Sequence, residues 1–560
     1  MLETSSSEPG IRQLTPTQLR LTLANSLPES ASRTEKISTI EAGLRSLAGQ
    51  SLRDAISGWI VDEIVPVKRL VPDAYENWRP PVREAMMFVV AHLSPARLAP
   101  KILEQLELPK NTSPETRLLR LIAKVPGLQK LGQVIARNQH LRPALRDALA
   151  RLENGIRDVK AEEMREIIQR DLGERLQTYH VHVESKILSE ASVSAVLRFT
   201  WRDPASGRRA RGVFKVLKPH IPEYFAEDMH YLQGLAHHFA DRHHTYGFPS
   251  RLIPDTFKKV RRLLRHEVNF RREQRALIEA GELYRNLRGV RVPRLIRPLC
   301  SSRITALTEE RGIKVTNAAA RSAPERRQRI ADQLVEALVV FPLLSAEENV
   351  IFHGDPHAGN LLYDRRTGEL AIIDWALRER LSRDQRRHLA VLFAMVGLRD
   401  RAGTRNEVLA LTQRKIRNSS ARGRTIRDTV EHFLDELPAT SWPSMGDVMR
   451  LLERLAMTGV SFPASLIMLS KVMFTLDGIL ADIAGPNTRM GVAIVRHLAE
   501  QWISDRKAFR SPLVVSDWVT LQCSSLLYTT RLWMCWEQAI LDRLLPDVVA
   551  ITPSARGVTP

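Results

Sequence analysis

The sequence predicts an α+β protein, with a small sheet and a polar loop set among many helices. Strand composition is concentrated between residues 183 and 217, where apolar and β-branched residues flank the turn Pro204–Gly207. A second strand signal, Leu370–Ile373, follows the polar loop that starts at His353. Over much of the remaining chain apolar residues recur at three- and four-residue spacing, which indicates amphipathic helices. The order of helices, sheet and helices predicts two lobes, a small one rich in strands and a larger helical one.

Composition limits the class of protein. The 560 residues are 44% apolar and 26% charged, which is typical of a globular chain of two to four domains. Three cysteines in this length favour a reducing compartment, and the N-terminus lacks the pattern of a signal peptide, so we expect a cytoplasmic protein. The net charge of +20 comes largely from arginines scattered along helices without interleaved aromatic residues. We therefore expect contact with nucleotide or anionic lipid headgroups rather than with nucleic acid.

The chain before the sheet is expected to be helical. Residues 1–110 carry no motif and are interpreted as a helical N-terminal region. Residues 111–182 form a helical extension that contains the K-x-G-Q tetrad, with Lys130 and Gln133 at its ends. Taken alone the tetrad says little, because a lysine and a glutamine three residues apart simply share one face of a helix.

Residues 183–310 are expected to form the small lobe. The segment SKILSEASVSAVLRFTW reads as one strand and ARGVFKVLKP as the next, while Val290–Ile296 and Arg303–Leu307 read as the last strands of the same sheet. Lys215 lies inside the second strand. A lysine there would place its ammonium against nucleotide phosphates, and it needs a carboxylate partner because burying a lone charge is costly.

Three further features of the small lobe concern nucleotide binding. The first turn carries Ala191 and Ser192 where a glycine-rich phosphate loop would lie. In the basic segment that follows, Glu267 and Glu273 are six residues apart, so one can pair with Lys215 while the other faces another group if a helix begins between them. Glu309, in the hinge after the last strand, is a candidate nucleotide contact.

Residues 311–500 are expected to form the large lobe, and the loop from His353 to Asp374 carries its chemistry. Asp355 is followed five residues later by Asn360, and Asp374 comes just after an apolar strand. Kinase-like proteins use this spacing for phosphoryl transfer: the first aspartate orients or deprotonates the acceptor, while the asparagine and the second aspartate hold Mg²⁺. The alternative, a polar turn capping a strand, does not explain three oxygen ligands at these intervals.

The sequence after Asp374 bears on the substrate. It enters a helical, arginine-rich pattern, RERLSRDQRRHLAVLFAMVG, with no long activation loop and no A-P-E anchor. Gly354 follows His353 where regulated kinases carry arginine. A protein substrate therefore lacks a docking platform. The tail, residues 501–560, is rich in Trp and Leu, and either docks on the core as a helix or contacts a membrane interface.

Taken together, these motifs resemble the UbiB/AarF family of atypical kinase-like proteins, which is associated with ubiquinone biosynthesis. The resemblance implies an atypical protein-kinase-like two-lobe fold with a large helical N-terminal extension and a helical C-terminal tail. It implies that the tetrad (Lys130, Gln133) folds over the active site and blocks a protein substrate, that an alanine loop (Ala191, Ser192) replaces the glycine loop, and that Glu273 pairs with Lys215. By the same resemblance, Asp355, Asn360 and Asp374 carry catalysis and Mg²⁺, and Glu267 faces Lys130.

The chain departs from the family pattern at several positions. Asn269 stands where the family has aspartate, Trp375-Ala376 replaces Phe-Gly, and Glu190 occupies a position where small apolar residues are typical.

The resemblance predicts an ATP- or ADP-binding, Mg²⁺-dependent ATPase or small-molecule or lipid-linked phosphotransferase. Its expected partners are isoprenoid lipid or quinone precursors and their biosynthetic enzymes, with peripheral contact at the inner face of the membrane. Two alternatives stay open: a small-molecule kinase of the aminoglycoside or choline type, and a nucleotide-binding regulator without catalysis.

Overall fold

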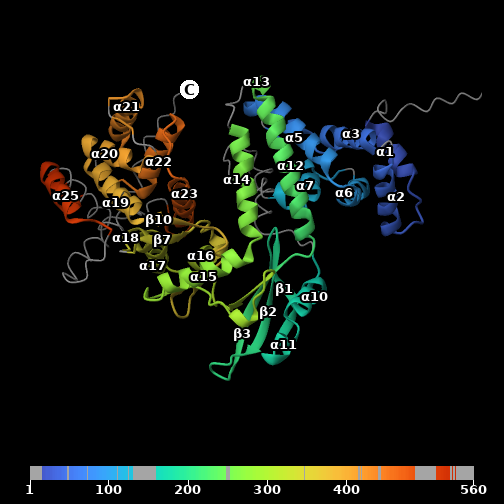
Figure 1. Ribbon diagram of the computed structural model, residues 1–560, viewed down its shortest axis with the longest axis horizontal. Helices are drawn as coiled ribbons and strands as arrows, with labels where there is room; N and C mark the ends of the chain where they lie inside the picture. The colour runs from blue at the N-terminus through green and yellow to red at the C-terminus, as the bar shows by residue number, and fades with distance from the viewer. Residues whose placement is uncertain are drawn as a thin grey trace, which may run out of the picture. The chain divides into compact units, whose positions relative to one another are not determined.

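The computed structural model describes residues 16–46, 49–71, 73–109, 111–123, 125–129, 159–246, 252–345, 347–413, 416–417, 419–438, 443–485, 512–529, 533 and 537. The chain forms two compact units. Unit 1 consists of Met1–Arg271 and Ile296–Glu309, and unit 2 of Arg272–Leu295 and Glu310–Pro560. The mixed helix and sheet composition agrees with the predicted α+β class (Figure 1).

The first part of unit 1 is helical. Its described helices are α1 (Pro16–Asn25), α2 (Arg33–Arg45), α3 (Gly49–Trp59), α4 (Val67–Leu70), α5 (Arg79–His92), α6 (Pro95–Glu107), α7 (Pro114–Ile122), α12 (Ile221–Asp241), α13 (His243–Tyr246) and α14 (Leu252–Glu267). Figure 1 shows α12 and α14 running alongside one another, and the two helices are in contact. Apolar residues of the N-terminal helices share one core with residues of α12 and α14, so these segments fold together.

A buried ion pair joins α6 to α12. Asp228 is fully buried; its Oδ1 accepts from Arg97 Nη2 at 2.7 Å and its Oδ2 from the Gly127 amide at 2.6 Å. Burial raises the pKa of the Asp228 carboxyl, although Arg97 and the Gly127 amide act in the opposite direction. The contact with Gly127 anchors the chain just before the predicted tetrad.

The sheet of unit 1 has four antiparallel strands in the order β1-β2-β3-β5. The strands are β1 (His182–Glu190), β2 (Ser194–Arg202), β3 (Arg209–Leu217) and β5 (Ile304–Thr308). Helix α10 (Ala161–Leu172) packs on it and is followed by α11 (Glu174–Thr178) (Figure 1). The segment that we expected to be one strand is a hairpin of two, because the chain turns at residues 191–193.

Unit 2 contains two small sheets. One has the order β4-β9-β8-β6, and the other is the antiparallel pair β10-β7. The strands are β4 (Val290–Arg291), β6 (Ile313–Lys314), β7 (Asn349–His353), β8 (Leu361–Asp364), β9 (Glu369–Ile372) and β10 (Arg378–Ser382). The expectation that Val290–Ile296 belongs to the small-lobe sheet is wrong. Only two of its residues form a strand, and they pair in parallel with β9 of unit 2.

The remaining helices belong mostly to unit 2, although α15 crosses the boundary between the units. They are α15 (Phe270–Leu283), α16 (Val315–Ala320), α17 (Pro324–Val335), α18 (Phe341–Leu344), α19 (Arg383–Leu398), α20 (Arg401–Leu411), α21 (Ala421–Glu436), α22 (Met445–Met457), α23 (Ala464–Ala484) and α25 (Val515–Leu527). The arginine-rich segment after Asp374 begins as strand β10, not as helix. Helix α19 starts at once because Ser382 and Gln385 form a capping box.

Two helices of unit 2 bear on membrane contact, α23 by its apolar composition and α25 by its exposed apolar side chains. Helix α23 is the one helix of the described ranges that is long and apolar enough to cross a bilayer, judged by length and composition alone. It contacts α16, α17 and α22, as a core helix of unit 2 does. Helix α25 packs on α19 through the Arg387–Asp517 ion pair, at 2.6 Å, and exposes Val519, Leu526 and Leu527 on its surface.

Candidate functional site

The end of β7 sets the position of the polar loop. His353 is the last residue of β7 and pairs with Arg378 of β10. The Gly354 amide donates to the Leu377 carbonyl at 2.9 Å. A Cβ atom at Gly354 would lie 3.0 Å from both the Leu377 carbonyl oxygen and the Leu377 Cγ, closer than a side chain normally tolerates. The close approach of these two segments therefore explains why glycine precedes Asp355.

His353 joins the segment that carries Asp355 to the segment that carries Asp374. Its Nδ1 accepts from the Asp355 amide at 3.2 Å, and its Nε2 lies 3.0 Å from the carbonyl oxygens of both Ile373 and Asp374. Because Nδ1 accepts and Nε2 donates, the ring is in the neutral Nε2–H form. Burial lowers the pKa of His353, which is 2% exposed, so the bridge stays neutral.

Asn360 lies one turn further along the same loop. Its side-chain Nδ2 donates to the Asp355 backbone carbonyl at 3.1 Å, and its backbone carbonyl accepts from the Ile373 amide at 2.9 Å. Because the side-chain NH₂ faces the Asp355 carbonyl, the side-chain Oδ1 of Asn360 points elsewhere and can accept from, or bind, another group. These bonds place Asp355, Asn360 and the chain entering Asp374 in one cluster, as the spacing predicts.

Asp374 has a backbone conformation that non-glycine residues rarely adopt. Its φ is 58°, in the left-handed region, and its Oδ1 accepts from the Ala376 amide at 3.3 Å. Trp375 is fully buried, donates from Nε1 to the Ile372 carbonyl at 3.1 Å, and packs edge-on against the His353 ring. The residue that replaces phenylalanine thus serves as the apolar anchor of this turn.

Sequence reasoning missed Lys471, a residue of α23. Its Nζ lies 3.1 Å from Asp355 Oδ1, and the two side chains are 28% and 19% exposed. The residues are 116 positions apart, so no local spacing connects them. The available signal was a single basic residue in the apolar segment Ala464–Ala484.

The oxygen-bearing side chains of this loop suit a hard cation. Asp374 supplies a carboxylate and Asn360 an amide oxygen, which are the ligand types that Mg²⁺ prefers. The hydrogen bond from Asn360 Nδ2 to the Asp355 carbonyl turns the NH₂ away from the ligand end of the amide, as a metal ligand requires. Within the described ranges, no group of three or more His, Cys, Asp or Glu residues is arranged to hold a metal. A magnesium site here would therefore rely on Asp374 and Asn360 together with ligands from a nucleotide.

Unit 1 carries the predicted phosphate loop as the turn between β1 and β2. The Ala191 amide donates to the Ser194 carbonyl at 2.8 Å, which closes the turn. Ser192 Oγ lies 3.3 Å from Glu267 Oε2, and Ser192 is 9% exposed. Glu267, which the resemblance implied would face Lys130, therefore contacts this loop.

A helix does begin between Glu267 and Glu273, which is the condition under which the two carboxylates can have different partners. Helix α14 ends at Glu267 and α15 begins at Phe270, so the two carboxylates need not share a face. Lys215 lies in β3, paired in register with Val196 and Thr305, and its Nζ is 5.8 Å from the centre of the Phe270 ring. Lys215 belongs to unit 1 and Glu273, 1% exposed, to unit 2. Their ion pair stays a prediction.

Two other small-lobe positions are engaged within unit 1. Glu190 forms an ion pair with Lys218 at 3.3 Å, with the two side chains 4% and 1% exposed. This pairing explains an acidic residue beside the loop, because Lys218 would otherwise bury its charge. Glu309 Oε1 accepts from Arg198 Nε at 2.6 Å, which ties the hinge to β2. The role of Glu309 toward a nucleotide stays a prediction.

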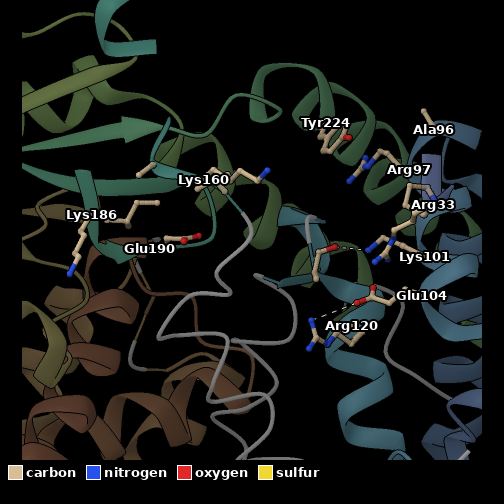
Figure 2. Close-up of a pocket in the computed structure, with 15 residues that line it drawn as sticks. Arg33, Ala96, Arg97, Lys101, Glu104, Arg120, Lys160, Lys186, Glu190 and Tyr224 are labelled. Carbon is tan, nitrogen blue, oxygen red and sulfur yellow. Dashed lines mark hydrogen bonds and ion pairs between the residues drawn. The ribbon is translucent and has the colours of Figure 1, made fainter. Parts of the chain in front are cut away.

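A cavity of about 850 Å³ lies within unit 1 (Figure 2). It is lined by six basic and two acidic side chains, among them Glu190. Several of the cations already have partners: Figure 2 shows Arg120 turned toward Glu104, at 3.6 Å, and Arg97 is bound to Asp228. The charge of the lining is thus partly neutralised, and we assign no ligand to this cavity. Lys130 and Gln133 lie outside the described residues, so their placement is not tested.

Comparison with known proteins agrees with this geometry. Residues 151–408 match the ABC1 atypical kinase-like domain. A relative named Probable protein kinase UbiB, from Glaesserella parasuis, is 25% identical over 278 residues, covering 48% of this chain and 49% of the relative. Protein ACTIVITY OF BC1 COMPLEX KINASE 7, chloroplastic, from Arabidopsis thaliana, is 23% identical over 360 residues, covering 63% and 50%.

Two further proteins are similar to this chain. An uncharacterized protein of Synechocystis is 25% identical over 367 residues, covering 64% of this chain and 60% of the relative. These matches span about half to three fifths of the curated relatives' length. A solved structure of a Mycobacterium tuberculosis protein in complex with erythromycin aligns with a TM-score of 0.40 and 16% identity, covering 64% of this chain and 87% of that one.

Proposed function

Because residues 151–408 of this chain carry an ABC1 atypical kinase-like domain, we propose that it binds ATP with Mg²⁺ and catalyses its hydrolysis or the transfer of its terminal phosphoryl group. The supporting observation is the hydrogen-bonded cluster in unit 2. His353 holds the Asp355 and Asp374 segments together, and Asn360 is fastened to the Asp355 carbonyl. Such a cluster is prearranged to direct oxygen ligands to one place, which phosphoryl transfer requires.

Each residue has a distinct role in this proposal. Asn360 and Asp374 would hold a magnesium ion, which when bound neutralises charge on the nucleotide phosphates. Asp355 orients the acceptor hydroxyl or water and accepts its proton. Lys215, on β3, contacts the phosphates of the nucleotide, with Glu273 as its carboxylate partner.

The acceptor that we propose is not a protein. Only three residues separate Asp374 from β10, and α19 starts directly after β10, so the chain has no long segment here on which a peptide could dock. Water, a small molecule or a lipid-linked acceptor needs no such platform. The resemblance to UbiB proteins leads us to propose an isoprenoid lipid or quinone precursor.

A peripheral place at the inner face of the membrane fits this acceptor. Helix α25 exposes Val519, Leu526 and Leu527, and apolar side chains of this kind favour an interface. Deleting the gene and measuring quinone intermediates would test the pathway, because their accumulation is expected and an unchanged lipid profile would contradict it.

A nucleotide-binding regulator without catalysis is the second candidate. It is favoured by the loop between β1 and β2, where Ser192 is bound to Glu267 and side chains stand in place of glycines. Measured turnover separates the two candidates. The small-molecule kinase alternative of the aminoglycoside or choline type has less support, since the relatives named above carry UbiB or ABC1-type names.

The decisive experiment measures Mg²⁺-dependent ATP turnover and nucleotide-induced thermal stabilisation of the full chain. We expect Asp355→Asn to lower kcat by at least about 100-fold, since a positioned base contributes 10²- to 10⁴-fold. Asp364→Asn is the matched control, because Asp364 lies at the end of β8, where its side chain caps the hairpin turn. Turnover without a loss in Asp355→Asn would refute the assigned base, and stabilisation without turnover would favour the regulator.

A further inference from the structure

Lys471 contacts the side chain on which the proposed transfer depends. We infer that Lys471 is a positioning residue, whose ammonium holds the Asp355 carboxylate directed at the acceptor. This inference rests on the proposed function, because it assigns Lys471 a part in the same step. No spacing in the loop itself points to this residue.

The placement of Lys471 follows from packing in unit 2. Helix α23 packs against β10, and β10 pairs with β7, whose last residue is His353. This order brings the middle of α23 to the loop that starts after β7. Lys471 is the only basic residue of α23, and its Nζ lies 3.1 Å from Asp355 Oδ1. The contact is charge-assisted and both side chains are largely shielded from solvent, at 28% and 19% exposed.

The ammonium contacts the side chain of Asp355, whereas two neighbouring hydrogen bonds contact its backbone. The Asp355 amide donates to His353 Nδ1, and its carbonyl accepts from Asn360 Nδ2. Lys471 contacts the carboxylate itself, through a charge-assisted hydrogen bond. The backbone bonds therefore help to fix where Asp355 stands, and the contact with Lys471 helps to fix where its carboxylate points.

The transfer step gives the second reason, because the base must point at the acceptor proton. In this step, the acceptor oxygen bonds to the terminal phosphorus while the bond from phosphorus to the bridging oxygen breaks. The electron pair of that bond leaves with ADP, and the acceptor proton passes to the Asp355 carboxylate, whose direction Lys471 sets.

The test compares variants of the full chain in Mg²⁺-ATP turnover. Lys471→Met removes the charge while keeping the length of the side chain, so the helix should stay packed. We expect kcat to fall about 10- to 100-fold, the range found when a supporting partner of an active-site ligand is lost, with KM for Mg²⁺-ATP changed less than about 3-fold. Lys471→Arg should retain more of the rate than Lys471→Met. Ile467→Ala, one turn earlier on α23 and 54% exposed, is the control and should keep the parent kcat.

A double variant tests whether Lys471 acts through Asp355. In an Asp355→Asn background, adding Lys471→Met should change kcat less than about 3-fold, because the carboxylate that it positions is already gone. An equal loss in both backgrounds, or a kcat for Lys471→Met equal to the parent's, would overturn the inference while the proposed function stands.

A turnover-independent measurement keeps the two failures distinguishable. Absence of Mg²⁺-dependent turnover in the parent chain would refute the proposed function and, with it, the catalytic part of this inference. The ion pair is then judged by thermal unfolding of the parent, both single variants and the double variant. Non-additive shifts in Tm support the pair, and additive shifts overturn it.

Discussion

Replacing His353 by leucine should loosen the loop that carries Asp355 and Asn360, by an amount that follows from the hydrogen bonds lost. The change removes the acceptor of the Asp355 amide and the donor shared by the Ile373 and Asp374 carbonyls. A buried polar group left without a partner costs about 1–3 kcal/mol. The variant leaves the Asp355 amide without its acceptor, and it leaves two carbonyls without the donor that they share. If the amide and the pair of carbonyls each count once, the free energy of local opening should fall by about 2–6 kcal/mol.

The pH dependence gives this prediction a second, independent readout. Burial lowers the pKa of His353 below its ordinary value of 6.5, so the unfolded chain binds the proton more tightly than the folded one. Stability from this site is complete above pH 6.5 and is lost as the pH falls from there toward the folded-state pKa. The slope in that window is at most about 1.4 kcal/mol per pH unit. His353→Leu should lack this component.

Hydrogen exchange of a peptide covering residues 349–364 measures both quantities, after correction for the intrinsic exchange rate at each pH. His432→Leu is the control, since His432 is a surface residue, with its side chain 77% exposed, that pairs with Glu436 on α21. Unchanged protection of the peptide in His353→Leu, or the same acid-side slope in variant and parent, would refute the role of His353 as a neutral bridge.

Three other substitutions test separate parts of the site. Asp374→Asn should abolish the Mg²⁺-dependent part of nucleotide-induced thermal stabilisation, because it removes the principal carboxylate ligand; a metal-dependent shift equal to the parent's would show that Asp374 is not a ligand. Glu190→Gln should destabilise the chain by about 3–5 kcal/mol in denaturant unfolding, since it leaves Lys218 buried without its carboxylate, and adding Lys218→Met should recover most of the loss. Lys215→Met and Glu273→Gln should each weaken ATP binding in titration calorimetry, and the double variant should be little worse than either; fully additive losses would argue against their ion pair.

Much of unit 2's site could be predicted from spacing. Asp355, Asn360 and Asp374 lie within 20 positions, on a loop and a hairpin whose geometry depends on local hydrogen bonds. Local bonds of this kind are encoded by neighbouring residues, so the residue types and their intervals are sufficient to indicate the cluster. The break between Glu267 and Phe270 was compatible with the spacing of Glu267 and Glu273 but was not predicted by it.

Other predictions failed where the pairing of a strand depended on residues far away in the sequence. Val290–Ile296 has strand composition, but which sheet it joins depends on whether β5 or β9 offers an edge. The segment SKILSEASVSAVLRFTW was read as one strand although Ala191 and Ser192 were placed in a turn, and the pairing of β1 with β2 shows two strands joined by that turn. The composition of a segment indicates whether its side chains suit the faces of a sheet. It does not indicate which strand will pair with that segment.

By itself, the sequence determined the α+β class, the clustering of Asp355 and Asn360 with the chain that enters Asp374, and the short connection between Asp374 and the helix that follows. Only the tertiary structure decided which lysine pairs with Asp355 and which with Glu190. Lys471 reaches Asp355 across 116 positions because α23 packs on β10. Lys218 reaches Glu190 because β3 pairs with β2 and ends beside the turn that follows β1. Charges attract at any separation along the chain, so a pair of this kind is set by packing of the elements that carry it and leaves no mark in the spacing of the residues.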